Sequence, residues 1–124
     1  MSPTAKSLNE KSCQPCEGGV SPLSRDEVEH LLQEVDGWEL TKDRTRIVCY
    51  WKTKDFMAAI EFLLRVAEVA ETEGHHPDVH LTGYRHVLIE LTTHAIDGLS
   101  ENDFILARKI DDIPVSIYRS TNSS

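Results

Sequence analysis

The sequence predicts an α+β domain built on a single four-stranded antiparallel sheet with helices on one face, in the order α-β-β-α-β-β-α. Apolar residues recur at helical spacing in three segments, near residues 24–36, 54–73 and 100–112. Between these segments lie two strand pairs rich in β-branched and alternating side chains, at 38–52 and 78–93. With 124 residues, the chain suits one domain whose helices and sheet share a core.

The two ends of the chain lack this periodicity. Residues 1–22 are rich in Ser, Pro, Lys, Gly and Glu, which predicts a flexible N-terminal segment. Residues 23–115 form the predicted domain, and residues 116–124 form a polar C-terminal tail.

The three cysteines are Cys13, Cys16 and Cys49. Cys13 and Cys16 form a CxxC pair, which can be half of a zinc site or a redox couple. A zinc site needs a second pair of ligands, and a redox couple is expected at the start of a helix that follows a strand. A solvated tail is therefore the favoured interpretation, and a functional pair is the alternative. An odd cysteine count does not indicate a disulfide framework, so we expect a reducing compartment, the cytoplasm by default.

The overall charge limits the partners of the chain. A formal net charge of −8 argues against direct nucleic-acid binding and against docking on an anionic membrane, since both need a basic surface. No apolar run approaches the roughly 18 residues of a membrane-spanning helix.

The first helix is expected to begin at Ser24, where Ser24-Arg-Asp-Glu27 forms a capping box, and to end at Asp36-Gly37. A hairpin then joins a short strand at 38–40 to a strand at 45–52.

The central helix is expected to run from Lys54 to Glu73, with Thr53 as its cap. It is apolar around most of its circumference, whereas a helix covering one side of a sheet needs only one apolar face. A chain of this size has no third layer to cover the second face, so we predict that this face contacts another copy of the chain. The two apolar stripes are Phe56, Ile60, Leu63, Ala67 and Ala70, and Ala59, Phe62, Val66 and Val69.

Five of the six histidines lie between Glu71 and His94. Gly74 ends the helix and Pro77 prevents its continuation, which places His75 and His76 in a helix-to-strand connection. The second strand pair follows, and His94 closes it. The last helix begins with a second capping box, Ser100-Glu-Asn-Asp103.

Clustered histidines suggest a metal site, a nucleophile site or proton transfer. Metal binding is disfavoured because adjacent imidazoles diverge and the chain has no HExxH motif. No GxSxG elbow or neighbouring cysteine indicates a nucleophile, and no cofactor is expected. Imidazoles titrate near ~6.5, so several of them around one pocket suit acid–base elimination of water.

These residues resemble the signature of the pterin-4a-carbinolamine dehydratase family. The match departs from the family's commonest form in one respect, an extra residue between Pro77 and Tyr84 at a turn. The resemblance covers residues 24–112, and its motifs are Glu71, His75-His76-Pro77, Tyr84, Leu91-Thr-Thr-His94, Gly98-Leu-Ser-Glu101, Asp103 and Gly37-Trp38.

The resemblance implies dehydration of 4a-hydroxytetrahydropterin to quinonoid dihydropterin, in tetrahydrobiopterin recycling, by a hydro-lyase without a metal or cofactor. It implies that His75 and His94 are the acid–base pair and that His76 lies near the 4a-hydroxyl. Glu71 would orient an imidazole, and the expected pterin contacts are Gly74, Thr93 and Ala95. For Asp103 a site role and a capping role are equally favoured. His80 and His86 are expected outside the site.

The resemblance also implies partners. Family members are tetramers built from dimers, which agrees with the two-faced helix, so a homo-oligomer is expected. The alternative function is a non-catalytic interaction module, since some relatives are dimerisation cofactors of a transcription factor. The sequence itself does not indicate such a partner.

Overall fold

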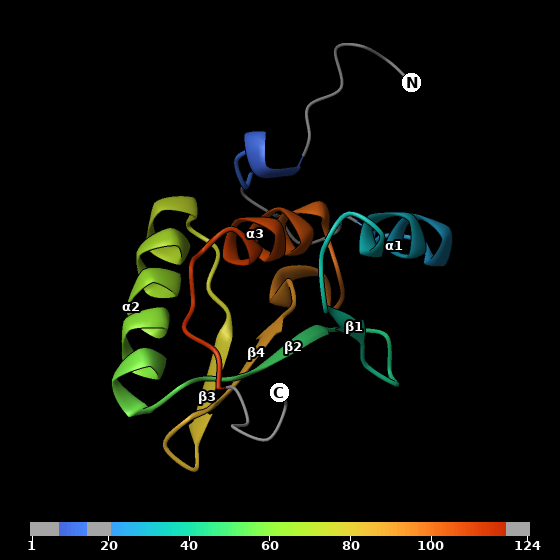
Figure 1. Ribbon diagram of the computed structural model, residues 1–124. Helices are drawn as coiled ribbons and strands as arrows, with labels where there is room; N and C mark the ends of the chain where they lie inside the picture. Colours follow the sequence, from blue (N-terminus) through green and yellow to red (C-terminus); the bar gives the residue numbers. More distant parts are fainter. Residues whose placement is uncertain (1–7, 15–20, 119–124) are drawn as a thin grey trace.

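The computed structural model describes residues 8–14 and 21–118, and it confirms the predicted fold class and element order (Figure 1). Two short 3-10 helices are added to the expected elements. In chain order the elements are η1 (Leu8–Glu10), α1 (Arg25–Leu32), β1 (Glu39–Leu40), β2 (Ile47–Lys52), α2 (Phe56–Glu73), β3 (Asp78–Thr82), β4 (His86–Leu91), η2 (His94–Ile96) and α3 (Glu101–Asp111).

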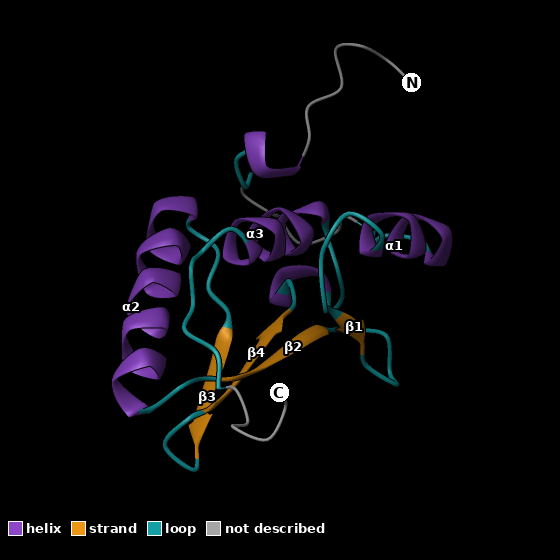
Figure 2. Ribbon diagram, viewed as in Figure 1, coloured by secondary structure: helices purple, strands orange, loops and turns teal. Residues whose placement is uncertain are grey.

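The sheet has the strand order β1-β2-β4-β3, and every neighbouring pair is antiparallel. In the central pair, Cys49 lies opposite Ile89, so their buried side chains point to the same face of the sheet. Helices α2 and α3 cover that face, while no helix of the described residues lies on the other face of the sheet (Figure 2). The core therefore lies between the sheet and these two helices, with Phe62 and Phe104 as its largest fully buried side chains.

Two helix boundaries differ from the sequence prediction. Helix α1 begins at its Ser24 capping box as predicted but ends at Leu32, four residues before Asp36, in a series of turns. Helix α2 is capped by Asp55, whose Oδ1 accepts a hydrogen bond from the Ala58 N–H at 2.8 Å. Thr53 is not the cap, because its buried hydroxyl donates to the Arg85 and Asp55 carbonyls instead.

Helix α2 has apolar side chains on both of its faces. Ala59, Phe62, Val66 and Ala70 are buried against the core. The outward face is exposed within the chain: Phe56 by 50%, Met57 by 62%, Ile60 by 40% and Leu64 by 61%. An exposed apolar face is therefore present, but its composition differs from the prediction: Met57 and Leu64 belonged to neither predicted stripe, and Ala70 of the first stripe is buried.

Residues 8–14 pack on α3, although the sequence predicted a flexible N-terminal segment (Figure 1). Leu8 is 3% exposed and belongs to the core cluster. Lys11 forms an ion pair with Glu101 at 2.7 Å. A single anchoring leucine produces no periodicity, so the sequence carried no sign of this packing. Cys16 lies outside the described residues.

Part of the predicted C-terminal tail is also paired. Ile117 forms a bridge with Thr53, and the Tyr118 N–H donates to the Lys52 carbonyl at 2.9 Å. These contacts place residues 116–118 beside the end of β2; residues 119–124 are not described. Among the helices that the structure describes, none is long and apolar enough to cross a membrane.

Candidate active site

The end of α2 positions the first two histidines. Gly74 adopts a left-handed conformation, with φ 66° and ψ 26°, and its N–H donates to the Ala70 carbonyl. The His75 N–H donates to the same carbonyl at 3.2 Å. This glycine turn ends the helix, and Pro77 follows where a helix could not continue. His75 and His76 therefore leave the helix in the connection to β3, as the sequence predicted.

His75 is fixed by Asp103 from the first turn of α3. The His75 Nε2 lies 2.6 Å from the Asp103 Oδ1, and the Asp103 side chain is fully buried. Since an ionised carboxylate only accepts hydrogen bonds, this contact assigns the ring hydrogen to Nε2 and leaves Nδ1 free to take a proton. The opposite carboxylate oxygen accepts from the Ser100 N–H at 3.0 Å and from the Thr93 hydroxyl at 2.8 Å.

Asp103 makes the predicted capping contact and also contacts His75, but it does not line the cavity, so a direct role in substrate binding stays a prediction. Its Oδ2 caps α3 through Ser100, and its Oδ1 orients the His75 ring. The capping box places this carboxylate in the first turn of α3, where it reaches His75 just beyond the C-terminal end of α2.

His94 is not on the strand that the sequence predicted, because β4 ends at Leu91. It begins the 3-10 helix η2, within a tight loop closed by an antiparallel bridge between Thr93 and Gly98. The Thr93 N–H donates to the Gly98 carbonyl at 2.9 Å. His94 is exposed, and no described residue is hydrogen-bonded to its imidazole.

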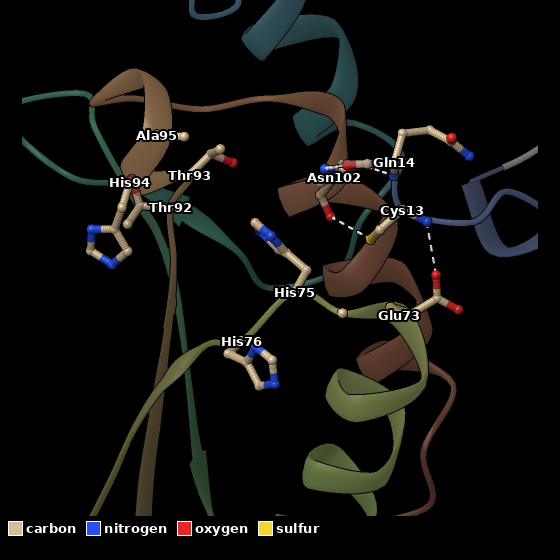
Figure 3. Close-up of a pocket in the computed structure, with 11 residues that line it drawn as sticks. Cys13, Gln14, Glu73, His75, His76, Thr92, Thr93, His94, Ala95 and Asn102 are labelled. Carbon is tan, nitrogen blue, oxygen red and sulfur yellow. Dashed lines mark hydrogen bonds between the residues drawn. The ribbon is translucent and has the colours of Figure 1, made fainter. Parts of the chain in front are cut away.

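These segments enclose a cavity of about 470 Å³. This volume lies within the usual range for small-molecule sites. Figure 3 shows His75 near the centre, His94 on one side, and Cys13 and Asn102 on the other. The lining residues are Cys13, Gln14, Glu73, Gly74, His75, His76, Thr92, Thr93, His94, Ala95 and Asn102.

Comparison with known proteins identifies the family. The family described as pterin 4 alpha carbinolamine dehydratase matches residues 21–113. The chain belongs to this family. It is 45% identical over 111 residues to pterin-4-alpha-carbinolamine dehydratase 2, mitochondrial, of Arabidopsis thaliana, which covers 87% of this chain and 59% of the relative. It is 48% identical over 105 residues to a putative pterin-4-alpha-carbinolamine dehydratase of Halorhodospira halophila, which covers 85% of this chain and 95% of the relative.

A solved structure supports the same assignment. The crystal structure of a transcriptional coactivator/pterin dehydratase from Brucella melitensis superposes with a TM-score of 0.68 and 34% sequence identity. The match covers 73% of this chain and 95% of the Brucella chain. The pterin-4a-carbinolamine dehydratase family is one of hydro-lyases, so the comparisons agree with the reaction class inferred from the histidine cluster.

The structure brings together most residues that the family resemblance singled out. His75, His76 and His94 all line the cavity, as do Gly74, Thr93 and Ala95. Glu71 does not line it, but its carboxylate contacts the His76 Nε2 at 2.5 Å from an exposed position. Glu71 therefore contacts His76 rather than either member of the expected acid–base pair, and its orienting role stays a prediction.

The other two histidines of the cluster lie elsewhere. His80 Nε2 contacts the Glu90 carboxylate at 2.6 Å on the face of the sheet that carries no helix. His86 contacts the Tyr50 hydroxyl on the same sheet. Neither histidine lines the cavity.

Five lining residues were absent from the predicted site. Asn102 adjoins Asp103 at the start of α3, and Thr92 precedes Thr93, so both positions could have been inferred from their neighbours. Cys13 and Gln14 lie in a segment without periodicity, so only the structure places them there. The fifth is Glu73, which accepts a hydrogen bond from the Cys13 N–H at 2.8 Å.

Neither described cysteine has the properties of a nucleophile. Burial is the main cause that raises the pKa of Cys13 from 9.0 to about 12, and the Glu73 carboxylate adds to it. Burial likewise raises the pKa of Cys49 to about 12. We predict that iodoacetamide at pH 8 alkylates both residues at least about tenfold more slowly than a free thiol, because the thiolate is the reactive form. Peptide mass spectrometry over time measures each rate, and rapid alkylation of Cys13 would contradict its protonated state.

Proposed function

We propose that the chain dehydrates 4a-hydroxytetrahydropterin to quinonoid dihydropterin by histidine acid–base catalysis. The observation that carries the proposal is the convergence of His75, His76 and His94 on one cavity, with His75 held by a buried carboxylate. All of these residues lie within the segment that matches the family.

The reaction needs one proton delivered and one removed. The C4a–O bond breaks, and the leaving oxygen must be protonated because hydroxide leaves poorly. The N5–H proton is lost, and its electron pair forms the C4a=N5 double bond. A pocket with several imidazoles provides both an acid and a base without any redox group.

The three histidines differ in how they are held, which suggests different roles. His75 is 13% exposed and anchored, so it suits a proton transfer that needs fixed geometry. His94 is exposed, so it can exchange its proton with solvent and complete the pair. His76, restrained by Glu71, is assigned a position near the 4a-hydroxyl. Gly74, Thr93 and Ala95 line the cavity, which supports assigning them contacts with the pterin.

The test is the rate of carbinolamine dehydration with and without the protein, measured by stopped-flow absorbance because the spontaneous reaction competes. Acceleration that rises in proportion to protein concentration supports the proposal. A rate equal to the spontaneous one, from a folded protein, would refute it.

We also propose that the exposed apolar face of α2 joins copies of the chain into a dimer or tetramer. Four large apolar side chains are exposed along this helix, an arrangement that is uncommon on an isolated chain. The face is defined as Phe56, Met57, Ile60 and Leu64.

Leu64→Glu is therefore expected to shift the protein toward the monomer at micromolar concentration, since a charge would be buried in the contact. Multi-angle light scattering measures the mass. Arg65→Glu is the matched control: it introduces the same side chain at an exposed polar position that projects about 100° away from Leu64 around the helix, and it should leave the mass unchanged. A wild-type monomer would contradict the proposal.

The alternative function is a protein-interaction module on the same fold. It is favoured by the Brucella protein, which is named a transcriptional coactivator as well as a dehydratase, and by the exposed face of α2. A folded protein that leaves carbinolamine unchanged and binds a transcription factor through α2 would support it. Direct nucleic-acid binding is not proposed, given the net charge of −8.

The substrate is assigned only to the pterin class, and the cytoplasm stays the proposed location. Arabidopsis relatives carry mitochondrial and chloroplastic names, so fractionation of the source cells is the appropriate test.

A further inference from the structure

Residues 8–14, hereafter the strap, contribute one wall of the cavity. The other walls come from the end of α2, the loop after β4 and the start of α3, all within the family-matched residues 21–113. The strap lies before that segment. The acid–base groups therefore lie within the residues that the family model matches, while this wall comes from residues before them.

The strap is anchored by specific contacts along its length. The Asn102 carboxamide pairs with the backbone of Gln14, accepting from its N–H at 2.9 Å and donating to its carbonyl at 2.5 Å. The Cys13 N–H donates to the Glu73 carboxylate, which also forms an ion pair with Lys109 at 3.3 Å. Paired backbone groups hold the strap in one register, so the side chain at each position has a defined direction.

Residue 13 is the one that this register turns toward the cavity. Figure 3 shows the Cys13 sulfur directed toward Asn102 and His75, while the Gln14 side chain points away from the histidines. The sulfur lies 3.5 Å from the Asn102 carbonyl oxygen. Cys13 and His94 lie on opposite sides of His75 (Figure 3). The Cys13 sulfur therefore faces a different part of a bound ligand from the part that His94 faces.

We propose that the strap is a substrate-contacting wall of the pterin site, and that residue 13 determines how large a substrate the site accepts. This inference rests on the proposed function for its substrate class. Cys13 and the Gln14 backbone are bonded to Glu73 and Asn102 rather than to a histidine. The strap therefore acts on the portion of the substrate away from the reacting C4a–N5 bond. Such a contact is made equally in the ground state and the transition state, and it changes KM rather than kcat.

The first experiment enlarges residue 13. Cys13→Leu should raise KM for carbinolamine and the dissociation constant of 7,8-dihydrobiopterin by about tenfold, since overfilling a packed site carries a cost of that order. The kcat value should stay within about twofold of the wild type. Ser12→Leu is the matched control, because Ser12 is exposed, adjacent and outside the cavity.

The second experiment removes contacts that hold the strap on α3, without changing a residue that lines the cavity. Leu8→Ala with Lys11→Ala removes the buried anchor and the ion pair with Glu101. In this background, adding Cys13→Leu should change the dissociation constant less than about threefold, because the leucine no longer lies at the wall. Such a loss of effect is the coupling that a double-mutant cycle measures.

The outcomes separate this inference from the proposed function. A wild-type protein that binds dihydrobiopterin but does not accelerate dehydration refutes the function, while the binding measurements still test the wall. If the wild type is active and the Cys13→Leu variant has the same KM and the same dissociation constant, the proposal that the strap is a substrate-contacting wall is refuted. An equal effect of Cys13→Leu with the strap docked and released also overturns it, as does a wild type that binds no dihydrobiopterin.

Discussion

Replacing His75 with alanine lowers kcat for carbinolamine dehydration by about 10²–10⁴-fold, the usual contribution of a positioned acid–base group. The fold should persist, because the imidazole lines a cavity and is not part of the core cluster. His94→Ala should lower kcat by at least about tenfold. A smaller loss is expected there because His94 is exposed and water can partly replace it.

The chain provides matched controls for these variants in its other histidines. His80→Ala and His86→Ala remove imidazoles from the same stretch of sequence but from outside the cavity. Both should retain wild-type kcat within about twofold. Stopped-flow rates after subtraction of the spontaneous reaction give kcat, and circular dichroism checks the fold. Wild-type kcat values from both His75→Ala and His94→Ala would exclude the proposed mechanism.

The features of this site that could be predicted are those set by residues close together in the sequence. Pro77 and Gly74 act within a few residues, so the sequence predicted that His75 and His76 leave the helix, and the structure confirms it. The strand assignment of His94 was wrong because β4 stops at Leu91. Beyond Leu91, Thr93 pairs with Gly98 in a tight loop instead of with a neighbouring strand. The alternation of side chains along the sequence does not indicate where strand pairing gives way to such a loop.

Long-range contacts account for what the sequence did not predict. The strap is held by backbone groups bound to Asn102 and Glu73, residues distant in sequence, and backbone groups are the same at every position. Asp55 replaced Thr53 as the cap of α2 for a related reason. The Thr53 hydroxyl is occupied by the Arg85 carbonyl, which approaches from the β3–β4 connection. The sequence analysis indicated only Thr53, and tertiary packing makes Asp55 the cap instead.

Asp103 caps α3 through a nearby residue, Ser100, and contacts His75, which is distant in sequence. The Asp103→Asn variant should separate these two roles. Asparagine has one carbonyl oxygen, which can keep the contacts with the Ser100 N–H and the Thr93 hydroxyl. Its NH₂ group then faces the His75 Nε2 and donates where the carboxylate accepted. The imidazole must move its hydrogen to Nδ1, the nitrogen that the mechanism needs free.

We therefore expect Asp103→Asn to lower kcat/KM by at least about tenfold, with a loss of unfolding free energy under about 2 kcal/mol because the cap survives. Asp103→Ala removes the cap as well, leaving buried donors unpaired, and should lose about 1–3 kcal/mol more. The free energies are measured by urea denaturation and the rates by stopped flow.

Glu27→Gln is the matched control, because Glu27 occupies the same capping-box position in α1, is bonded to the Ser24 N–H and does not line the cavity that holds His75. It should leave kcat/KM unchanged. If Asp103→Asn keeps wild-type kcat/KM while Asp103→Ala loses stability, Asp103 serves only to cap α3. If Asp103→Asn loses activity at nearly constant stability, the carboxylate positions His75 for proton transfer. In that case one buried side chain joins the start of α3, the end of α2 and the loop after β4 into a single catalytic unit.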